Sequence, residues 1–190
     1  VGIWSASTLS ENNADVARSA QILRNHMQAD MMHDAMRTDV LASMLASNPA
    51  AGIEAAGVKA DLAEHDASFR EMIAANKALA ADEKTKALLA SIEPPLLTYV
   101  ESAKKIVDLA SQDPSAALKA LPEFMQQFST LESAMEQAGD EITAASDEIS
   151  KHSADIKASV DIVLKALLAA AALFALGLYF LTRKTVTKPI

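Results

Sequence analysis

The sequence predicts an all-α protein, an antiparallel up-down four-helix bundle whose last helix is continuous with a transmembrane helix. Three observations support this fold class. Glycine and proline are scarce, with 5 and 6 among 190 residues, while Ala, Leu, Met, Glu and Lys, which favour helices, are abundant. Apolar side chains recur at alternating steps of three and four residues, as in the seams of packed helices. An apolar run near the C-terminal end is long enough to cross a bilayer.

The apolar run covers residues 162–182, and its stretch 166–181 contains no charged residue. A membrane-spanning helix needs about 20 mostly apolar residues. Arg183, Lys184 and Lys188 follow the run, so the positive-inside rule places the C-terminal side in the cytoplasm. We therefore expect the bundle on the opposite, non-cytoplasmic side of the membrane.

The charges divide along the chain in the way that this topology requires. All 25 acidic residues lie at or before Asp161, whereas the residues after it carry four cations and no acid. We expect three parts: an acidic helical body over 1–161, a transmembrane helix over 162–182 and a basic cytoplasmic segment over 183–190. The acidic body excludes a nucleic-acid partner. The absence of cysteine excludes disulfides, cysteine-bound zinc and a cysteine nucleophile.

The first two helices are separated by a clear turn signal. Nothing breaks a helix from about residue 5 to 47, and residues 1–4 either begin this helix or end an earlier membrane helix, with Trp4 at the interface. The stretch Asn-Pro-Ala-Ala-Gly at 48–52 then predicts a turn. A second helix is expected over about 53–80.

The later helices follow from proline and aspartate positions. Asp82 is an expected N-cap for a third helix that continues to about residue 111, with a kink at Pro94 and Pro95. A turn at 112–115 places proline at the first position of the last helix. This helix should continue through the membrane, with Pro122 marking a second kink or a fresh start.

The apolar seams support four packed helices. The second helix shows Val58, Leu62, His65, Phe69, Met72, Asn76 and Leu79. The third shows Ile92, Leu96, Tyr99, Ala103, Ile106 and Ala110. The last shows Leu121, Met125, Phe128, Glu132, Met135, Gly139 and Ile142, and continues toward the membrane.

The first helix carries two stripes instead of one. One contains Val16, Ala20, Leu23, Met27, Asp30, Asp34, Arg37, Leu41 and Met44. The other contains Ile22, His26, Ala29, His33, Met36 and Val40. A helix with two seams packs inside its own bundle and against a second subunit. We therefore expect a homodimer through the first and last helices.

The layout resembles the sensor region of bacterial chemoreceptors, the methyl-accepting chemotaxis proteins of the four-helix-bundle type. The segment Asp-Met-Met-His-Asp-Ala-Met-Arg-Thr-Asp-Val-Leu at 30–41 is similar to their first helix, and Thr-Val-Thr-Lys-Pro-Ile at 185–190 to the opening of a HAMP linker. The resemblance implies a bacterial inner-membrane protein in which 1–161 is a periplasmic sensor domain and 183–190 is the cytoplasmic start of a HAMP linker. It also implies that a small ligand shifts the last helix, and that the shift passes through the membrane to a cytoplasmic kinase complex.

Two other classes share this layout. The sensor region of a membrane histidine kinase or diguanylate cyclase can have the same bundle and linker, with an enzyme as its output domain. A membrane-anchored bundle with a structural role is the third possibility. Within the chain itself we expect no enzymatic activity, because it has no Gly-rich phosphate loop, no His-Glu-x-x-His pair and no nucleophile motif.

Histidines form the first candidate site. Counted from the expected turn at 48–52, His33 and His65 lie at similar heights on facing helices, and His26 belongs to a layer nearer the membrane. With a carboxylate they suit Zn²⁺, Ni²⁺ or Cu²⁺, and a haem held between helices is a further option. The alternative is that these histidines are core residues hydrogen-bonded to Asp.

Arginines form the second candidate site. Arg37 interrupts an apolar seam and Arg70 follows Phe69, and a guanidinium grips a carboxylate in bidentate fashion. A small organic anion would then contact Arg37 and Arg70, with His33, Asp34 and Tyr99 beside it. The alternative is an internal ion pair between Arg37 and Asp34.

Overall fold

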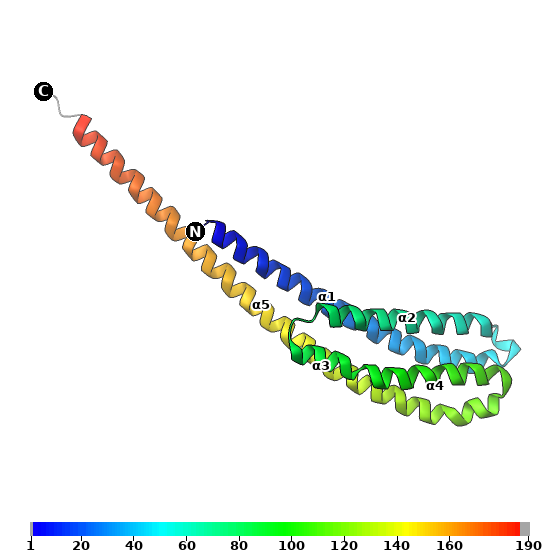
Figure 1. Cartoon of the computed structure of the whole chain (residues 1–190). Coiled ribbons are helices and arrows are strands. Elements are labelled where there is room, and N and C mark those ends of the chain that lie inside the picture. The colour runs from blue at the N-terminus through cyan, green and yellow to red at the C-terminus, as the bar shows by residue number, and fades with distance from the viewer. Residues whose placement is uncertain (1, 187–190) are drawn as a thin grey trace. The chain divides into compact units, whose positions relative to one another are not determined.

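The computed structural model describes the backbone of residues 2–186 and the side chains of residues 7–183, and every regular element in this part is helical. The all-α prediction is therefore confirmed. The elements are α1 (Gly2–Ala46), the 3₁₀ turn η1 (Pro49–Ala51), α2 (Ala55–Leu79), α3 (Glu83–Ser91), α4 (Glu93–Gln112) and α5 (Pro114–Val186) (Figure 1). The side chain of Trp4 and residues 187–190 of the expected linker lie outside the described residues.

Side-chain caps fix the turns between helices. The Asn48 Oδ1 accepts a hydrogen bond from the Ala50 N–H at 3.0 Å, and Gly52 follows with φ of 65°, a left-handed conformation that glycine adopts without steric cost. Asp82 accepts from the Thr85 N–H at 2.7 Å, and this bond lowers the pKa of Asp82. Asp113 caps α5 in the same way, ahead of proline at the first helical position.

The proline residues have two different effects. Pro94 and Pro95 stand in the first turn of α4, and the chain breaks between α3 and α4 at Ile92, where we expected a kink. Pro122 lies inside α5 without ending it. The prediction that the last helix runs unbroken is therefore confirmed from Pro114 to Val186.

The chain divides into two compact units, one of residues 17–147 and the other of residues 1–16 and 148–190. The 17–147 unit contains a single apolar core to which all five α-helices contribute. Its largest fully buried side chains are Met36, Leu62, Phe69, Leu89, Ile92, Tyr99, Ile106, Phe124, Leu131 and Met135. This core positions the candidate site.

Burial tests the predicted seams. Six positions expected on the third helix are buried, and on α2 Val58, Leu62, Phe69 and Asn76 are buried too. Of the two stripes on α1, the one with His33 and Met36 is buried. On α5 the expected register is partly wrong. The buried positions are Phe124, Phe128, Leu131, Met135, Ala138 and Ile142, whereas Met125 and Glu132 are exposed.

The second unit contains the apolar part of α5. Here Asn12 of α1 donates from Nδ2 to the Ser153 Oγ at 2.8 Å, and both side chains are buried. From 161 to 183 every side chain is exposed. By length and composition this is the one helix in the described part of the chain that is long and apolar enough to cross a membrane.

Candidate functional site

A cluster of aromatic and polar side chains surrounds His33 in the 17–147 unit. Its imidazole stacks on Phe128 of α5, with ring centroids 4.1 Å apart and planes 7° apart. Tyr99 of α4 lies at 5.2 Å from the same ring and donates its hydroxyl hydrogen bond to the His33 carbonyl at 2.9 Å. Three helices therefore meet at this histidine, which is only 1% exposed.

Arg37 covers the outer side of the same cluster. Its guanidinium lies 4.2 Å from the centre of the Phe128 ring and forms an ion pair with Asp34 at 2.9 Å. A cation over an aromatic face is an attractive arrangement. Four of the five residues predicted to bind a ligand, His33, Asp34, Arg37 and Tyr99, are thus brought together, and the internal Arg37–Asp34 pair is present.

Burial controls the protonation of this cluster. It lowers the pKa of His33 below its usual 6.5, more than the neighbouring Asp34 and Asp30 carboxylates raise it. Burial likewise raises the pKa of Tyr99. The His33 Nε2 has no hydrogen-bond partner. At neutral pH the cluster therefore contains a neutral imidazole with one unsatisfied nitrogen.

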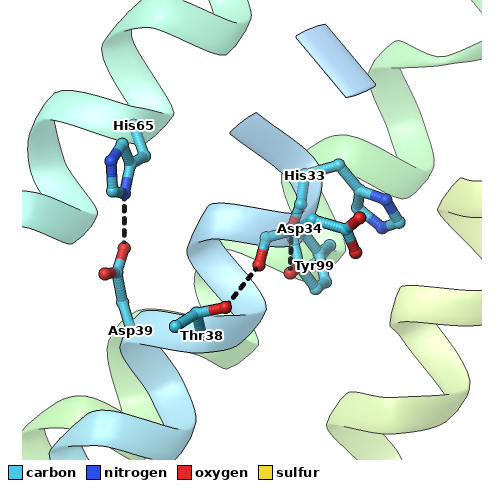
Figure 2. Close-up of polar contacts among 6 residues, drawn as sticks. All are labelled: His33, Asp34, Thr38, Asp39, His65 and Tyr99. Carbon is cyan, nitrogen blue, oxygen red and sulfur yellow. Dashed lines mark hydrogen bonds and ion pairs between the residues drawn. The ribbon is translucent and has the colours of Figure 1, made fainter. Parts of the chain in front are cut away.

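His65 lies apart from His33. Its Nδ1 is 2.7 Å from the Asp39 Oδ2, and Figure 2 shows the two imidazole rings pointing away from each other. Burial raises the pKa of Asp39, and His65 acts in the opposite direction. A hydrogen bond to Asp, as His65 makes here, was the alternative to a metal site that the sequence left open for the histidines.

Arg70 also lies outside the cluster. Its Nε is 2.6 Å from Asp66, whose other oxygen accepts from Lys104 of α4 at 2.8 Å. The buried Asp66 thus has two cationic partners, which offsets the cost of taking its charge out of water. Arg70 and Arg37 are each engaged with a carboxylate of their own helix, so carboxylate binding by either one stays a prediction.

His26 lies at the floor of a separate groove on α1 and α5. The groove has a volume of about 480 Å³ and is lined by Leu23, His26, Met27, Asp30, Glu132, Ser133, Met135, Glu136, Gly139, Asp140 and Thr143. Although it lines the groove, His26 is only 8% exposed, and its Nδ1 has no hydrogen-bond partner. Burial lowers its pKa more than Asp30 and the Met135 backbone raise it.

Gly139 makes room for this histidine. A Cβ at position 139 would lie 2.7 Å from the His26 Nε2, a distance that real side chains essentially never show. Any other residue at 139 would displace the imidazole or the helix. The approach of α1 to α5 at this level therefore depends on glycine.

The histidines do not combine into one centre. In the portion of the chain that the structure describes, no group of three or more His, Asp or Glu side chains could hold a metal ion. His33 is enclosed by aromatic rings, His65 pairs with Asp39, and His26 belongs to the groove. A metal or haem site built from His33, His65 and His26 stays a prediction without support from this arrangement.

Two features of these clusters were not predicted from the sequence. Phe128 was expected only as a core residue, yet it contacts both His33 and Arg37. The groove acids Glu136 and Asp140 belonged to no predicted site. Their spacing from Glu132, with each acid four positions after the one before, was the available signal, because residues at i, i+4 and i+8 lie on one side of a helix.

Comparison with known proteins gives no relatives. No protein-family model, no curated protein and no solved structure matches this chain.

Proposed function

We propose that this chain is the sensing half of a transmembrane receptor that resembles the chemoreceptors, with 17–147 as an antiparallel up-down four-helix bundle. A small signal molecule binds the bundle outside the inner membrane. Binding favours one position of α5 over another, and the change reaches the cytoplasmic side, where it controls a kinase. A ligand that prefers one of two helix positions is sufficient for this mechanism.

The proposal rests on α5, which contributes to the core along one stretch and is apolar and exposed along another. Between Phe124 and Ile142 one face of the helix is buried in the core, and from 166 to 181 the same helix is exposed and contains no charged residue. No described break separates the two stretches. An exposed apolar stretch of this length is unfavourable in water and favourable in a bilayer, so the helix suits a link between a sensing core and a membrane.

We further propose that a second copy of the chain covers exposed apolar side chains of α1. Met31, Leu41 and Leu45 are between 43% and 65% exposed. Apolar side chains at three- and four-residue steps are the usual contact between parallel helices. The homodimer would pair α1 and α5 with their copies.

Topology is the first test, and the chain is well suited to it because it has no cysteine. Ser115→Cys reports on the α4–α5 turn and Lys184→Cys on the far end of α5. In intact spheroplasts of an expressing bacterium, we expect a membrane-impermeant maleimide to label Ser115→Cys at once. Labelling of Lys184→Cys should require lysis. Labelling of both sites, or of Lys184→Cys alone, would refute the proposed receptor topology.

Signal transfer is the second test. The chain is fused to the kinase-control region of a chemoreceptor, and kinase activity is measured after insertion of one or of four alanines in the exposed stretch of α5. One residue rotates the following helix by about 100°, whereas four nearly restore the original direction. We expect one insertion to change kinase output strongly and four to change it less. Equal output from all three chains would refute transmission through α5.

A further inference from the structure

His26 is a buried titratable side chain that the proposed function does not use. It is 8% exposed, and its Nδ1 is buried without a hydrogen-bond partner. One nitrogen of a neutral imidazole donates and the other accepts, whereas both donate once the ring is protonated. Protonation here would bury an N–H group that has no acceptor, which is unfavourable, and burial accordingly lowers the pKa of His26. The present position of the ring therefore suits its neutral form.

Gly139 of α5 provides the space in which the neutral ring lies. A Cβ at position 139 would lie 2.7 Å from the His26 Nε2 and 3.2 Å from its Cδ2. The imidazole thus occupies the place that a side chain at 139 would take. Because the ring packs directly on α5, any movement of the ring changes the contact between α1 and α5.

The groove beside the ring contains the acceptors that its present position lacks. Four carboxylates line the groove together with His26, namely Asp30 from α1 and Glu132, Glu136 and Asp140 from α5. All four residues are exposed, and within residues 7–183 none of them forms an ion pair with a cationic side chain. A carboxylate is a strong acceptor for a protonated imidazole. A charged ring would therefore be more stable in the groove than against Gly139.

The polar groups of the other helices leave the groove negative. Arg24 of α1 donates to a neighbouring glutamine of its own helix. Lys84 of α3 pairs with Glu141 of α5 at 2.5 Å. From α2 comes the neutral Asn76, whose Nδ2 donates to a backbone carbonyl of α1 at 3.0 Å. No lysine or arginine lines the groove, so a protonated ring that enters it meets negative charge.

We propose that His26 is a pH-sensitive switch in the contact between α1 and α5. The neutral imidazole packs against Gly139. The protonated imidazole turns into the groove, where the carboxylates accept its N–H hydrogen bonds, and the packing of α1 on α5 loosens at this level. The switch goes beyond the proposed function, because it requires neither a ligand nor an output domain. Acidity would act on α5, the helix that continues without a described break into the apolar stretch.

His33 is a natural control, because it is buried on the same helix in different surroundings. The rings of Phe128 and Tyr99 cover its imidazole. Its neighbour Asp34 is already paired with Arg37, whose guanidinium lies 4.2 Å from the centre of the Phe128 ring. A cation close by disfavours a second positive charge. We therefore expect no comparable movement of His33 at the same pH.

The test measures the distance between α1 and α5 by double electron–electron resonance on the full chain in phosphatidylcholine nanodiscs. Nitroxide labels are attached to Gln28→Cys and Gln137→Cys, which replace exposed, uncharged residues outside the groove lining. The chain has no native cysteine to compete for the label. Histidine changes charge between about pH 7.5 and pH 5. Over this range we expect a second, longer distance, whose ratio to the first rises by up to about tenfold per pH unit. An unchanged distance distribution would overturn the proposal.

A second label pair separates the switch from general unfolding in acid. Ala67→Cys on α2 and Thr98→Cys on α4 lie at exposed positions and should keep one distance at both pH values. An equal change in the two label pairs would show that the whole bundle loosens, and would overturn a local switch at His26.

Two variants at the contact should have opposite effects. His26→Phe keeps a ring of similar size that cannot be protonated, so it should abolish the longer distance at low pH. Gly139→Ala excludes the ring from its place and should produce the longer distance already at neutral pH. His33→Phe is the matched control and should keep the wild-type response. A response retained in His26→Phe, or lost in His33→Phe alone, would overturn the assignment.

Circular dichroism melts verify that each variant is folded. If a variant at the contact does not fold, Glu132→Gln/Glu136→Gln decides, because it keeps the ring and its packing and removes two acceptors. It should move the midpoint of the distance change to lower pH, whereas Glu64→Gln/Glu71→Gln, which removes the same charge from exposed positions of α2, should not. Equal shifts in both would refute the role of the groove. The distances are measured without ligand or kinase, so failure of the switch leaves the topology and signal-transfer tests of the proposed function unaffected.

Discussion

Two buried histidines on α1 have opposite surroundings, although they lie only seven residues apart. His33 is enclosed by Phe128 and Tyr99, and its exposure is 1%. His26 rests against Gly139 and borders an acid-lined groove. Each has one nitrogen without a partner. We call the surroundings of His33 the closed layer, because aromatic rings cover it. We call the surroundings of His26 the open layer, because it borders a groove and packs against a glycine of α5.

The two layers differ in buried area and in access to solvent. Aromatic rings exclude water and bury large areas, so the closed layer contributes mainly to stability. The open layer buries less and keeps carboxylates within reach of solvent, which is what a small-ligand site requires. If this division is correct, the two layers should respond differently to side-chain truncation, to changes in packing, to pH and to loss of charge.

The largest effect should come from removing the aromatic cover. Phe128→Ala deletes a ring that is 4% exposed and contacts His33 and Arg37, so we expect a loss of about 3–5 kcal/mol in the free energy of unfolding. Met27→Ala, at a side chain 62% exposed on the groove, should lose less than about 0.5 kcal/mol. Denaturant unfolding of both variants, followed by circular dichroism, measures the difference. Similar losses would show that the open layer is packed like the closed one.

The second effect concerns the glycine of the open layer. Gly139→Ala places a Cβ against the His26 imidazole and should cost about 1–3 kcal/mol of stability. In a His26→Ala background the clash is absent, and alanine should stabilise the helix by up to about 1 kcal/mol. Gly57→Ala on α2, where a Cβ meets nothing within 4 Å, is the control and should also stabilise. A stabilised Gly139→Ala single variant would contradict the tight approach.

The third effect is on pH dependence. Burial depresses the folded-state pKa of both His33 and His26 below 6.5, so the unfolded chain binds more protons than the folded chain as pH falls below that value. Stability should therefore be constant above about pH 6.5 from these groups and decrease below it, by about 1.4 kcal/mol for each unit of pKa depression. Unfolding curves between pH 5 and 8 measure this slope. The double variant His33→Phe/His26→Phe should flatten this slope. An unchanged slope in that variant would mean that other groups cause the pH dependence of stability.

The smallest effect concerns the arginines. Arg37→Gln removes the cation over Phe128 and the pair with Asp34 and should cost about 0.5–1 kcal/mol. Arg70→Gln should cost less, because Asp66 keeps Lys104 as a partner. Chemical unfolding again provides the measurement. A larger loss for Arg70→Gln would mean that the ion pair with the buried Asp66 contributes more to stability than the contact of Arg37 with Phe128.

The helices and their boundaries were largely predictable from local chemistry. Capping by Asp82, the left-handed Gly52 and proline at the start of α5 depend on residues next to one another in the chain. The seam on the third helix was also correct, because Tyr99 and its companions define a single apolar face. Such features need no knowledge of what packs against the helix.

Rotation of the helices was harder to predict. The expected and observed faces of α5 share Phe128, Met135 and Ile142, but the structure buries Phe124 and Leu131 where the sequence favoured Met125 and Glu132. Both faces have a regular spacing, and only the neighbouring helices decide between them. The same limit explains the histidines, since equal heights for His33 and His65 do not determine which way their rings point.

Gly139 has an evolutionary consequence. The imidazole of His26 and the missing Cβ at 139 occupy one space, so neither position is free to drift while the other is kept. Among descendants of this sequence, replacement of His26 by a smaller residue should open position 139 to alanine, and retention of the histidine should keep the glycine. Correlated variation at these two sites, which lie 113 positions apart in the chain, would indicate that the packing of His26 against Gly139 has been maintained.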